Sequence, residues 1–206
     1  MKRLKPAINM NIITECISDD IKPLDITAGE TVPISLNGHP RVIFLLKGSV
    51  ECYRTEDDLL ISEVSAPYVM GVMVNEVENF YYYIKPVKNT VLGYVNYNDF
   101  ISSVKRHDLW LDLLEVASHI TSYLIHRDIS LVNKDRYAVV MHYLKEIYSF
   151  TDEKRKGIMT TNYIVRRSGL SRSGVMAVLS ELRKGEYITI ENGVLTFLSD
   201  KVPKSF

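Results

Sequence analysis

The strongest constraint on the fold is a pattern of two short amphipathic segments followed by a hairpin, between residues 158 and 198. Ser168-Gly169-Leu170-Ser171 separates the two segments, because glycine can adopt the left-handed conformation that ends a helix and Ser171 can cap the next helix. Residues 172–184 then place one apolar face toward a core, made by Val175, Val178, Leu179 and Leu182.

Two apolar runs, residues 187–190 and 194–198, follow the second segment. The link between them contains Asn192-Gly193, the strongest short hairpin signal in a sequence. Helix, glycine turn, helix and hairpin together predict a winged helix-turn-helix, whose second helix lies in the major groove of DNA.

The second helix supplies most of the candidate DNA contacts. Base reading is assigned to Arg172, whose guanidinium can fork onto O6 and N7 of guanine. The same face carries Ser173, Met176, Ala177 and Ser180. Phosphate contacts are expected from Thr160, interpreted as the N-cap of the first helix, and from Arg166, Arg167, Ser171, Arg183 and Lys184. In the alternative interpretation, the arginines form a solvated face and the fold mediates protein contacts.

The charge distribution favours a nucleic-acid partner. The 206 residues include 25 Lys and Arg and 25 Asp and Glu, so the formal net charge is zero. Residues 1–110 carry 11 basic and 14 acidic side chains, and residues 111–150 carry 4 and 5. Residues 151–206 carry 10 and 6, which indicates a basic module that meets a polyanion, attached to a slightly acidic body.

Other classes of function find little support in the sequence. The N-terminus lacks the long apolar run of a signal peptide, no stretch is long enough to cross a membrane, and we expect a cytoplasmic protein. The five histidines lack metal-ligand spacing, and no catalytic motif is present, so we expect no metal, no cofactor and no enzyme. Cys16 and Cys52 are either inert small residues or a redox sensor.

Residues 20–98 are expected to form a β-domain. Short runs at 42–46, 50–53, 80–84 and 91–95 alternate with glycine-marked turns, and Pro86 is expected to close the third run. This pattern is typical of an all-β barrel or sandwich.

A long helix follows. Six residues are spaced as a heptad seam, namely Leu109, Leu113, Val116, Ile120, Tyr123 and Arg127. A second stripe lies beside it, made by Trp110, Leu114, Ala117, Thr121 and Leu124. We interpret the seam as a homodimer interface; the alternative is that this helix packs on its own β-domain. A further helix is expected to open at residues 133–135, and residues 151–157 are expected to be a surface loop.

The chain resembles the Crp/Fnr family of bacterial regulators over nearly its whole length. Residues 41–50, RVIFLLKGSV, look like the family's β-roll signature, and residues 67–71 look like the strand that leads to its next glycine. Residues 134–138 match the segment that opens the DNA-binding domain, and residues 169–175 match the start of the recognition helix. Among its subgroups, the small winged-helix regulators named for inhibition of peroxide resistance are the most similar.

The resemblance implies an α+β fold in three parts: a β-roll effector-like domain over 1–108, a long dimerisation helix over 109–131, and a winged helix-turn-helix over 132–206. It further implies a homodimer on a near-palindromic DNA site, and it allows RNA polymerase as a partner.

Two departures from the family pattern are informative. The family's Gly-Glu and phosphate-binding arginine are missing, because Gly71 is followed by Val72 and the later stretch reads Asn79-Phe80-Tyr81-Tyr82-Tyr83. We therefore expect a degenerate pocket, partly filled by Tyr81, Tyr82 and Tyr83, that binds no cyclic nucleotide. In the recognition helix, Ser173 and Ala177 replace two base-reading side chains of the family. A rival hypothesis is thus a protein-interaction module that has kept the fold and lost base reading.

Overall fold

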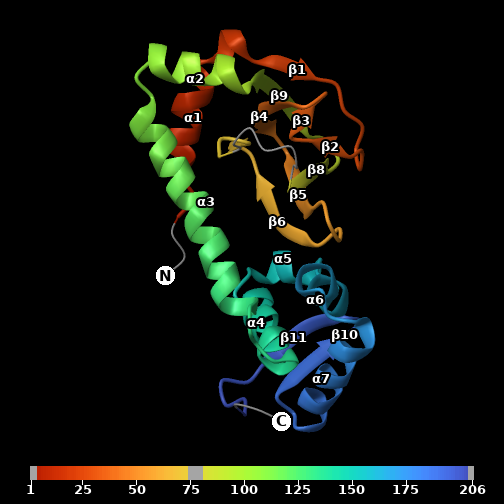
Figure 1. Cartoon of the computed structure of the whole chain (residues 1–206). Helices are drawn as coiled ribbons and strands as arrows, with labels where there is room; N and C mark the ends of the chain where they lie inside the picture. The colour runs from red at the N-terminus through yellow and green to blue at the C-terminus, as the bar shows by residue number, and fades with distance from the viewer. Residues whose placement is uncertain (1–3, 74–80, 204–206) are drawn as a thin grey trace. The chain divides into compact units, whose positions relative to one another are not determined.

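A computed structural model describes residues 4–73 and 81–203. The chain divides into two compact units, Met1–Ile125 and His126–Phe206 (Figure 1). Antiparallel sheets make up most of the first unit, and helices with a terminal hairpin make up the second, which confirms the predicted α+β fold class. The predicted functional division at residues 108 and 131 remains a prediction.

Two antiparallel sheets form the β-roll. One contains β1 (Lys22–Leu24), β9 (Val91–Asn96), β4 (His39–Lys47) and β3 (Ser35–Leu36) in that order, with β7 (Tyr68–Met70) also paired to β4. The other contains β2 (Val32–Pro33), β8 (Tyr82–Pro86), β5 (Ser49–Arg54) and β6 (Leu60–Ser65). The predicted strands are therefore confirmed with small shifts: Pro86 is the last residue of β8, and Phe80 lies outside the described residues.

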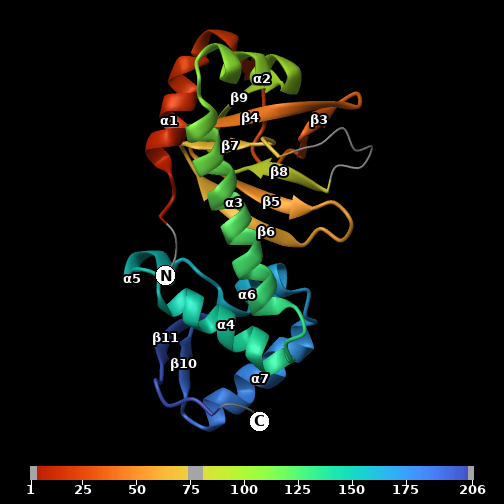
Figure 2. The same ribbon diagram turned by 60° about the vertical axis from the view of Figure 1, so that its left-hand side comes forward.

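Strand β4 reads as a continuous apolar run because both of its faces are buried. Ile43 and Leu45 belong to the core between the two sheets. Val42 and Phe44 belong to a second core against helices α1 (Ala7–Cys16), α2 (Tyr97–Arg106) and α3 (Trp110–Leu131) (Figure 2). Helix α1 and the short 3₁₀ helix η1 (Ser18–Asp20) were not among the predicted elements.

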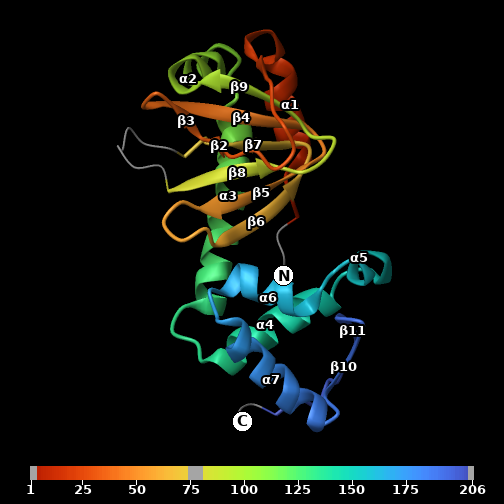
Figure 3. The same ribbon diagram turned by 90° about the vertical axis from the view of Figure 1, so that its right-hand side faces the viewer.

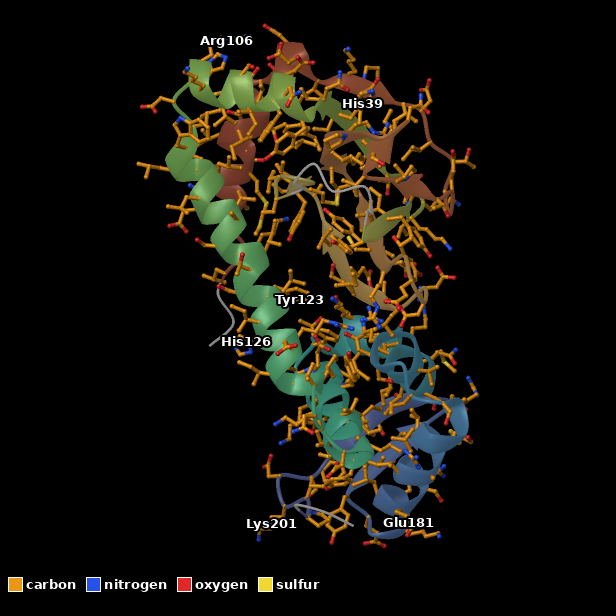
Figure 4. All side chains as sticks on the ribbon, in the orientation of Figure 1. His39, Arg106, Tyr123, His126, Glu181 and Lys201 are labelled. Atoms are coloured by element: carbon orange, nitrogen blue, oxygen red, sulfur yellow. The ribbon has the colours of Figure 1, made fainter. Side chains whose placement is uncertain are left out.

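The predicted dimerisation seam instead packs on its own chain. Leu109 and Val116 are buried in the core beneath α1 and α2, and Leu113 and Ile120 pack against that core. The Tyr123 hydroxyl donates a hydrogen bond to the backbone oxygen of Ile61 at 2.7 Å (Figure 4). Arg127, the sixth residue of the predicted set, donates from Nη2 to the backbone oxygen of Arg167 at 3.3 Å. Assigning Leu109, Leu113, Val116 and Ile120 to a partner was wrong, because the β-roll needs these side chains to complete its core. A role for Tyr123 and Arg127 in a dimer stays a prediction.

The C-terminal unit, whose backbone is drawn in Figure 3, folds around a core of its own. Its elements are α4 (Arg136–Tyr148), α5 (Asp152–Lys156), α6 (Thr160–Ser168), α7 (Arg172–Lys184), β10 (Ile188–Glu191) and β11 (Val194–Leu198). Asp135 caps α4 by accepting a hydrogen bond from the Ala138 amide at 2.7 Å. The core contains Val140 and Leu144 of α4 together with Ile164, Val175, Leu179 and Leu195.

The surface loop predicted at residues 151–157 is wrong, since this segment contains helix α5. The Thr151 hydroxyl caps the helix by accepting from the Lys154 amide at 3.5 Å. Asp152 and Glu153 occupy the first turn, and three basic residues occupy the last, so the charges match the helix dipole. A five-residue helix with no buried side chain leaves no apolar period for sequence analysis to detect.

Within residues 4–73 and 81–203, no helix combines the length and the apolar character needed to span a membrane.

Candidate nucleic-acid interface

The turn between α6 and α7 has the geometry that the sequence predicts. Gly169 ends α6 in the left-handed conformation, with φ of 71°. Ser171 then caps α7, because its Oγ accepts a hydrogen bond from the Gly174 amide at 3.1 Å. The two helices are thereby joined by three residues, as in a helix-turn-helix.

Helix α7 presents one face to solvent and buries the other. Val175, Leu179 and Leu182 are buried in the core, and Val178 packs against it. The residues of α7 predicted to face DNA are all exposed, namely Arg172, Ser173, Met176, Ala177, Ser180, Arg183 and Lys184. Lys184 also forms an exposed ion pair with Glu181 at 2.7 Å, and such a pair is weak enough to leave the lysine available to a phosphate (Figure 4). Their roles in binding stay predictions.

Two side chains from the first turn of α6 contact the exposed face of α7. The Arg172 guanidinium donates from Nη1 to Oδ1 of Asn162 at 2.7 Å. The Thr161 hydroxyl donates to the sulfur of Met176 at 3.5 Å. Sequence analysis missed Asn162 and Thr161, although two adjacent polar residues opening the first helix were the available signal.

The hairpin of β10 and β11 forms the wing. Asn192 and Gly193 both have positive φ, at 49° and 83°, as a tight two-residue hairpin turn requires. The Gly193 carbonyl accepts a hydrogen bond from the Thr160 amide at 2.8 Å. The tip of the wing is therefore tied to the first residue of α6.

Two of the predicted phosphate contacts are wrong. Thr160 is not the N-cap, which is Met159; it is fully buried, and its Oγ1 has no hydrogen-bond partner in the described part of the chain. Arg167 is also buried, with its guanidinium 3.7 Å from the centre of the Tyr163 ring. Thr160, Ile164 and Arg167 are spaced four and three residues apart and so share the core-facing side of α6. Arg166 and Ser171 are exposed, so their predicted phosphate contacts stand as predictions.

Replacing Thr160 with valine is expected to raise the free energy of unfolding of the C-terminal unit by about 1 kcal/mol. The substitution keeps the shape of the side chain and removes a buried hydroxyl that lacks a partner. Thermal unfolding measures the gain, with the exposed Thr189→Val as a control that should change little. DNA affinity should stay within about twofold of wild type; a clear loss would restore Thr160 as a contact residue.

In the β-roll, only one of the three tyrosines points toward the predicted pocket. The Gly71 amide donates a hydrogen bond to the Tyr82 hydroxyl at 3.1 Å, and Val72 is buried beside it. Tyr83 turns to the other face of β8, where its hydroxyl donates to Oδ1 of Asp58 at 2.7 Å and its ring stacks on Tyr53. Tyr81 is 70% exposed. The prediction that all three tyrosines fill the pocket was wrong, because consecutive strand residues face opposite sides.

Gly71 also has a steric reason to be glycine. Its φ is 84°, and a Cβ at this position would lie 2.3 Å from the backbone oxygen of Arg41. Strand β7 can therefore approach β4 at this point only because residue 71 has no side chain.

The two cysteines occupy different environments. Cys16 is exposed, whereas Cys52 is buried, and burial raises the pKa of the Cys52 thiol to about 11. Within the residues that the structure describes, no three His, Cys, Asp or Glu side chains are grouped to hold a metal ion.

Alkylation of the native protein with iodoacetamide at pH 8 is expected to modify Cys16 and leave Cys52 intact. With a pKa near 11, only about 0.1% of the Cys52 thiol is ionised at this pH, and the thiolate is the reactive form. Mass spectrometry of the intact protein should show one added group, and a second should appear in denaturant. Equal rates at both cysteines would contradict the assignment of Cys52 as inert.

The fold is that of the Crp/Fnr regulators, as the resemblance predicts. The c-di-GMP responsive global regulator CLP of Xanthomonas campestris superposes with a TM-score of 0.68 at 14% identity, covering 93% of this chain and 100% of that one. A CooA mutant from Carboxydothermus hydrogenoformans gives a TM-score of 0.66 at 15% identity, covering 89% and 86%. Residues 136–204 match a family model described as winged helix-turn-helix DNA binding.

Relatives with similar sequences indicate a narrower group of proteins than the fold does. The inhibitor of hydrogen peroxide resistance of Escherichia coli K12 is 26% identical over 204 residues, which cover 98% of each chain. The protein of the same name from Salmonella typhimurium LT2 is 28% identical over 175 residues, covering 84% of this chain and 83% of that one. The predicted similarity to this subgroup is therefore confirmed.

Proposed function

We propose that the chain is a DNA-binding transcription regulator of the Crp/Fnr type that acts as a homodimer on a near-palindromic site. The observation that carries this proposal is the exposed face of α7, which combines Arg172 at its start with Arg183 and Lys184 at its end. A guanidinium at the start of a recognition helix can reach base edges, while the terminal cations meet phosphates. In this role the chain needs no catalytic residue and no cofactor, and it acts in the cytoplasm with RNA polymerase as a partner.

The exposed stripe of α3 supports the homodimer. It is made by Leu111, Leu114 and Ile125, which lie on the face opposite the β-roll core, and by Leu124 on its flank. Exposed apolar side chains gathered on one face of a helix favour an interface with another protein. A two-fold axis along this stripe would pair the same face of both copies, so that the homodimer carries two copies of α7.

The β-roll is proposed to bind no cyclic nucleotide. The amide of Gly71 already donates to Tyr82, and β8 supplies no arginine to pair with a cyclic phosphate. The names of the relatives from E. coli and Salmonella suggest that the regulated genes affect resistance to hydrogen peroxide.

Cyclic AMP at 1 mM is therefore expected to leave the unfolding temperature of the protein unchanged. A ligand present at a hundred times its Kd would stabilise the folded state by about 2.7 kcal/mol, which thermal unfolding detects easily. ATP at the same ionic strength controls for non-specific anion effects. A dose-dependent rise that only cyclic AMP produces would contradict the proposal.

Selection of binding sites from random duplexes, with the purified full-length protein, tests the function. A gapped palindrome is expected, with half-sites about one duplex turn apart. The short side chains of Ser173 and Ala177 favour a second candidate, a protein-interaction module that reads no bases. Weak, sequence-blind binding that is lost at modest salt would reflect phosphate attraction alone and would favour that candidate.

A further inference from the structure

The middle of the exposed face of α7 is apolar. Met176 lies one helical turn after Arg172 and one turn before Ser180, so the three side chains follow one another along the same face. Met176 is 46% exposed, and Ala177 beside it is exposed as well. The part of the helix that would lie deepest in a major groove thus offers methyl and thioether groups instead of hydrogen-bond donors.

A contact from α6 restrains the Met176 side chain. The Thr161 hydroxyl donates to the Met176 sulfur at 3.5 Å, next to the hydrogen bond that holds Arg172 on Asn162. A methionine has three rotatable side-chain bonds, and fixing its sulfur removes part of the entropy that binding would otherwise cost. The Met176 side chain is therefore held at the face of α7 before any partner arrives.

The chemistry of the major groove offers one apolar partner for such a pair. Adenine, guanine and cytosine present hydrogen-bond donors and acceptors there, while thymine adds the C5 methyl group. An apolar side chain against a polar base edge would displace water from that edge without replacing its hydrogen bonds. Against a thymine methyl, the same side chain buries apolar surface at no such cost.

We propose that Met176 and Ala177 select thymine by contact with its C5 methyl group, at a base pair next to the one that Arg172 reads. The inference rests on the proposed function, since it needs α7 in the major groove. It makes the half-site a mixed one, in which a guanine is read by hydrogen bonds and a thymine by its methyl group.

Single replacement of thymine by deoxyuridine in the selected duplex tests the proposal, because it removes only the methyl group. Replacement of the thymine in one half-site should reduce the affinity of the wild-type protein about fourfold, the value of one buried methyl group. Replacement in both half-sites should reduce the affinity about fifteenfold. Thymines in the spacer provide the control and should tolerate the same replacement.

Met176→Gln identifies the side chain responsible. The variant keeps the length of the side chain and removes its apolar end, so it should discriminate between the thymine and deoxyuridine duplexes clearly less than the wild-type protein does. Met73→Gln, at a methionine of the N-terminal unit that is 54% exposed, is the matched control and should keep the wild-type difference. The thymine can also be replaced by cytosine or by 5-methylcytosine, each paired with guanine. The wild-type protein should bind the 5-methylcytosine duplex about threefold more tightly than the cytosine duplex.

The outcomes separate the inference from the proposed function. A sequence-specific site at which no thymine is sensitive to deoxyuridine overturns the inference and leaves the function in place. Sensitivity that persists undiminished in Met176→Gln assigns the methyl contact to another residue and also overturns it. Absence of any sequence-specific binding overturns the proposed function itself.

Discussion

Arg172→Ala is expected to abolish the preference for a G·C pair at one position of each half-site, and to cost about 1–3 kcal/mol per half-site at the preferred sequence. This cost corresponds to roughly a 5- to 150-fold loss of affinity. Arg172 is the first residue of α7, is exposed, and has its guanidinium oriented by Asn162 at 2.7 Å. Affinities for the selected duplex and for its single-base variants, at one fixed salt concentration, measure the effect.

Arg183→Ala is the matched control, because it removes the same guanidinium from the other end of the same helix. Loss of a phosphate contact at Arg183 should weaken binding about equally on all sequences and lower the slope of the salt dependence by about one ion for each half-site. If Arg172→Ala behaves in this same way, with its base preference intact, Arg172 contacts phosphate and base reading lies elsewhere on α7.

Local patterns were sufficient to predict the DNA-binding motif. Gly169, Ser171 and Asn192-Gly193 act through the conformation of their own backbone or through the first turn of a helix. The physical cause of each boundary therefore lies within a few residues of it, and the sequence alone contains that information.

Some side chains were assigned to the wrong role because the prediction used the residue type and did not consider which face of the helix or strand the residue occupies. Thr160 and Arg167 were predicted as phosphate contacts because hydroxyls and guanidiniums bind phosphate, but both share the buried face of Ile164. The prediction that Tyr81, Tyr82 and Tyr83 fill the pocket was wrong for the equivalent reason in a strand, since only Tyr82 points toward Gly71. The periodicity of 3.6 in a helix and two in a strand would have corrected both assignments.

The face of α3 that meets its own β-roll could not be predicted in this way. The helix carries two adjacent apolar stripes, and the choice between them depends on which stripe Phe44 and Val69 contact across the fold. Such contacts join residues far apart in the chain, so neither spacing nor propensity encodes them locally. The structure places Leu113, Val116 and Ile120 toward that core and leaves exposed the stripe made by Leu111, Leu114, Leu124 and Ile125.

This exposed stripe makes Leu114→Glu the substitution with the largest expected effect. Leu114 is 60% exposed, and Leu111, one turn before it, is 78% exposed. In a two-fold interface each substitution occurs twice, so the lost burial of leucine is about 1.5–3 kcal/mol on each side. Burial of two carboxylates adds to that cost. The dissociation constant of the dimer should therefore rise at least about 100-fold, as measured by sedimentation velocity at micromolar concentration.

DNA binding should change with the oligomeric state. A monomer engages one half-site only, so Leu114→Glu should reduce affinity for the full palindrome at least about 100-fold and leave affinity for an isolated half-site unchanged. Leu36→Glu is the matched control, because Leu36 in β3 is 49% exposed in the same unit and lies outside the stripe. It should remain dimeric and bind the palindrome normally. If Leu114→Glu stays dimeric as well, the second copy contacts another surface, and the apolar stripe of α3 needs a different partner.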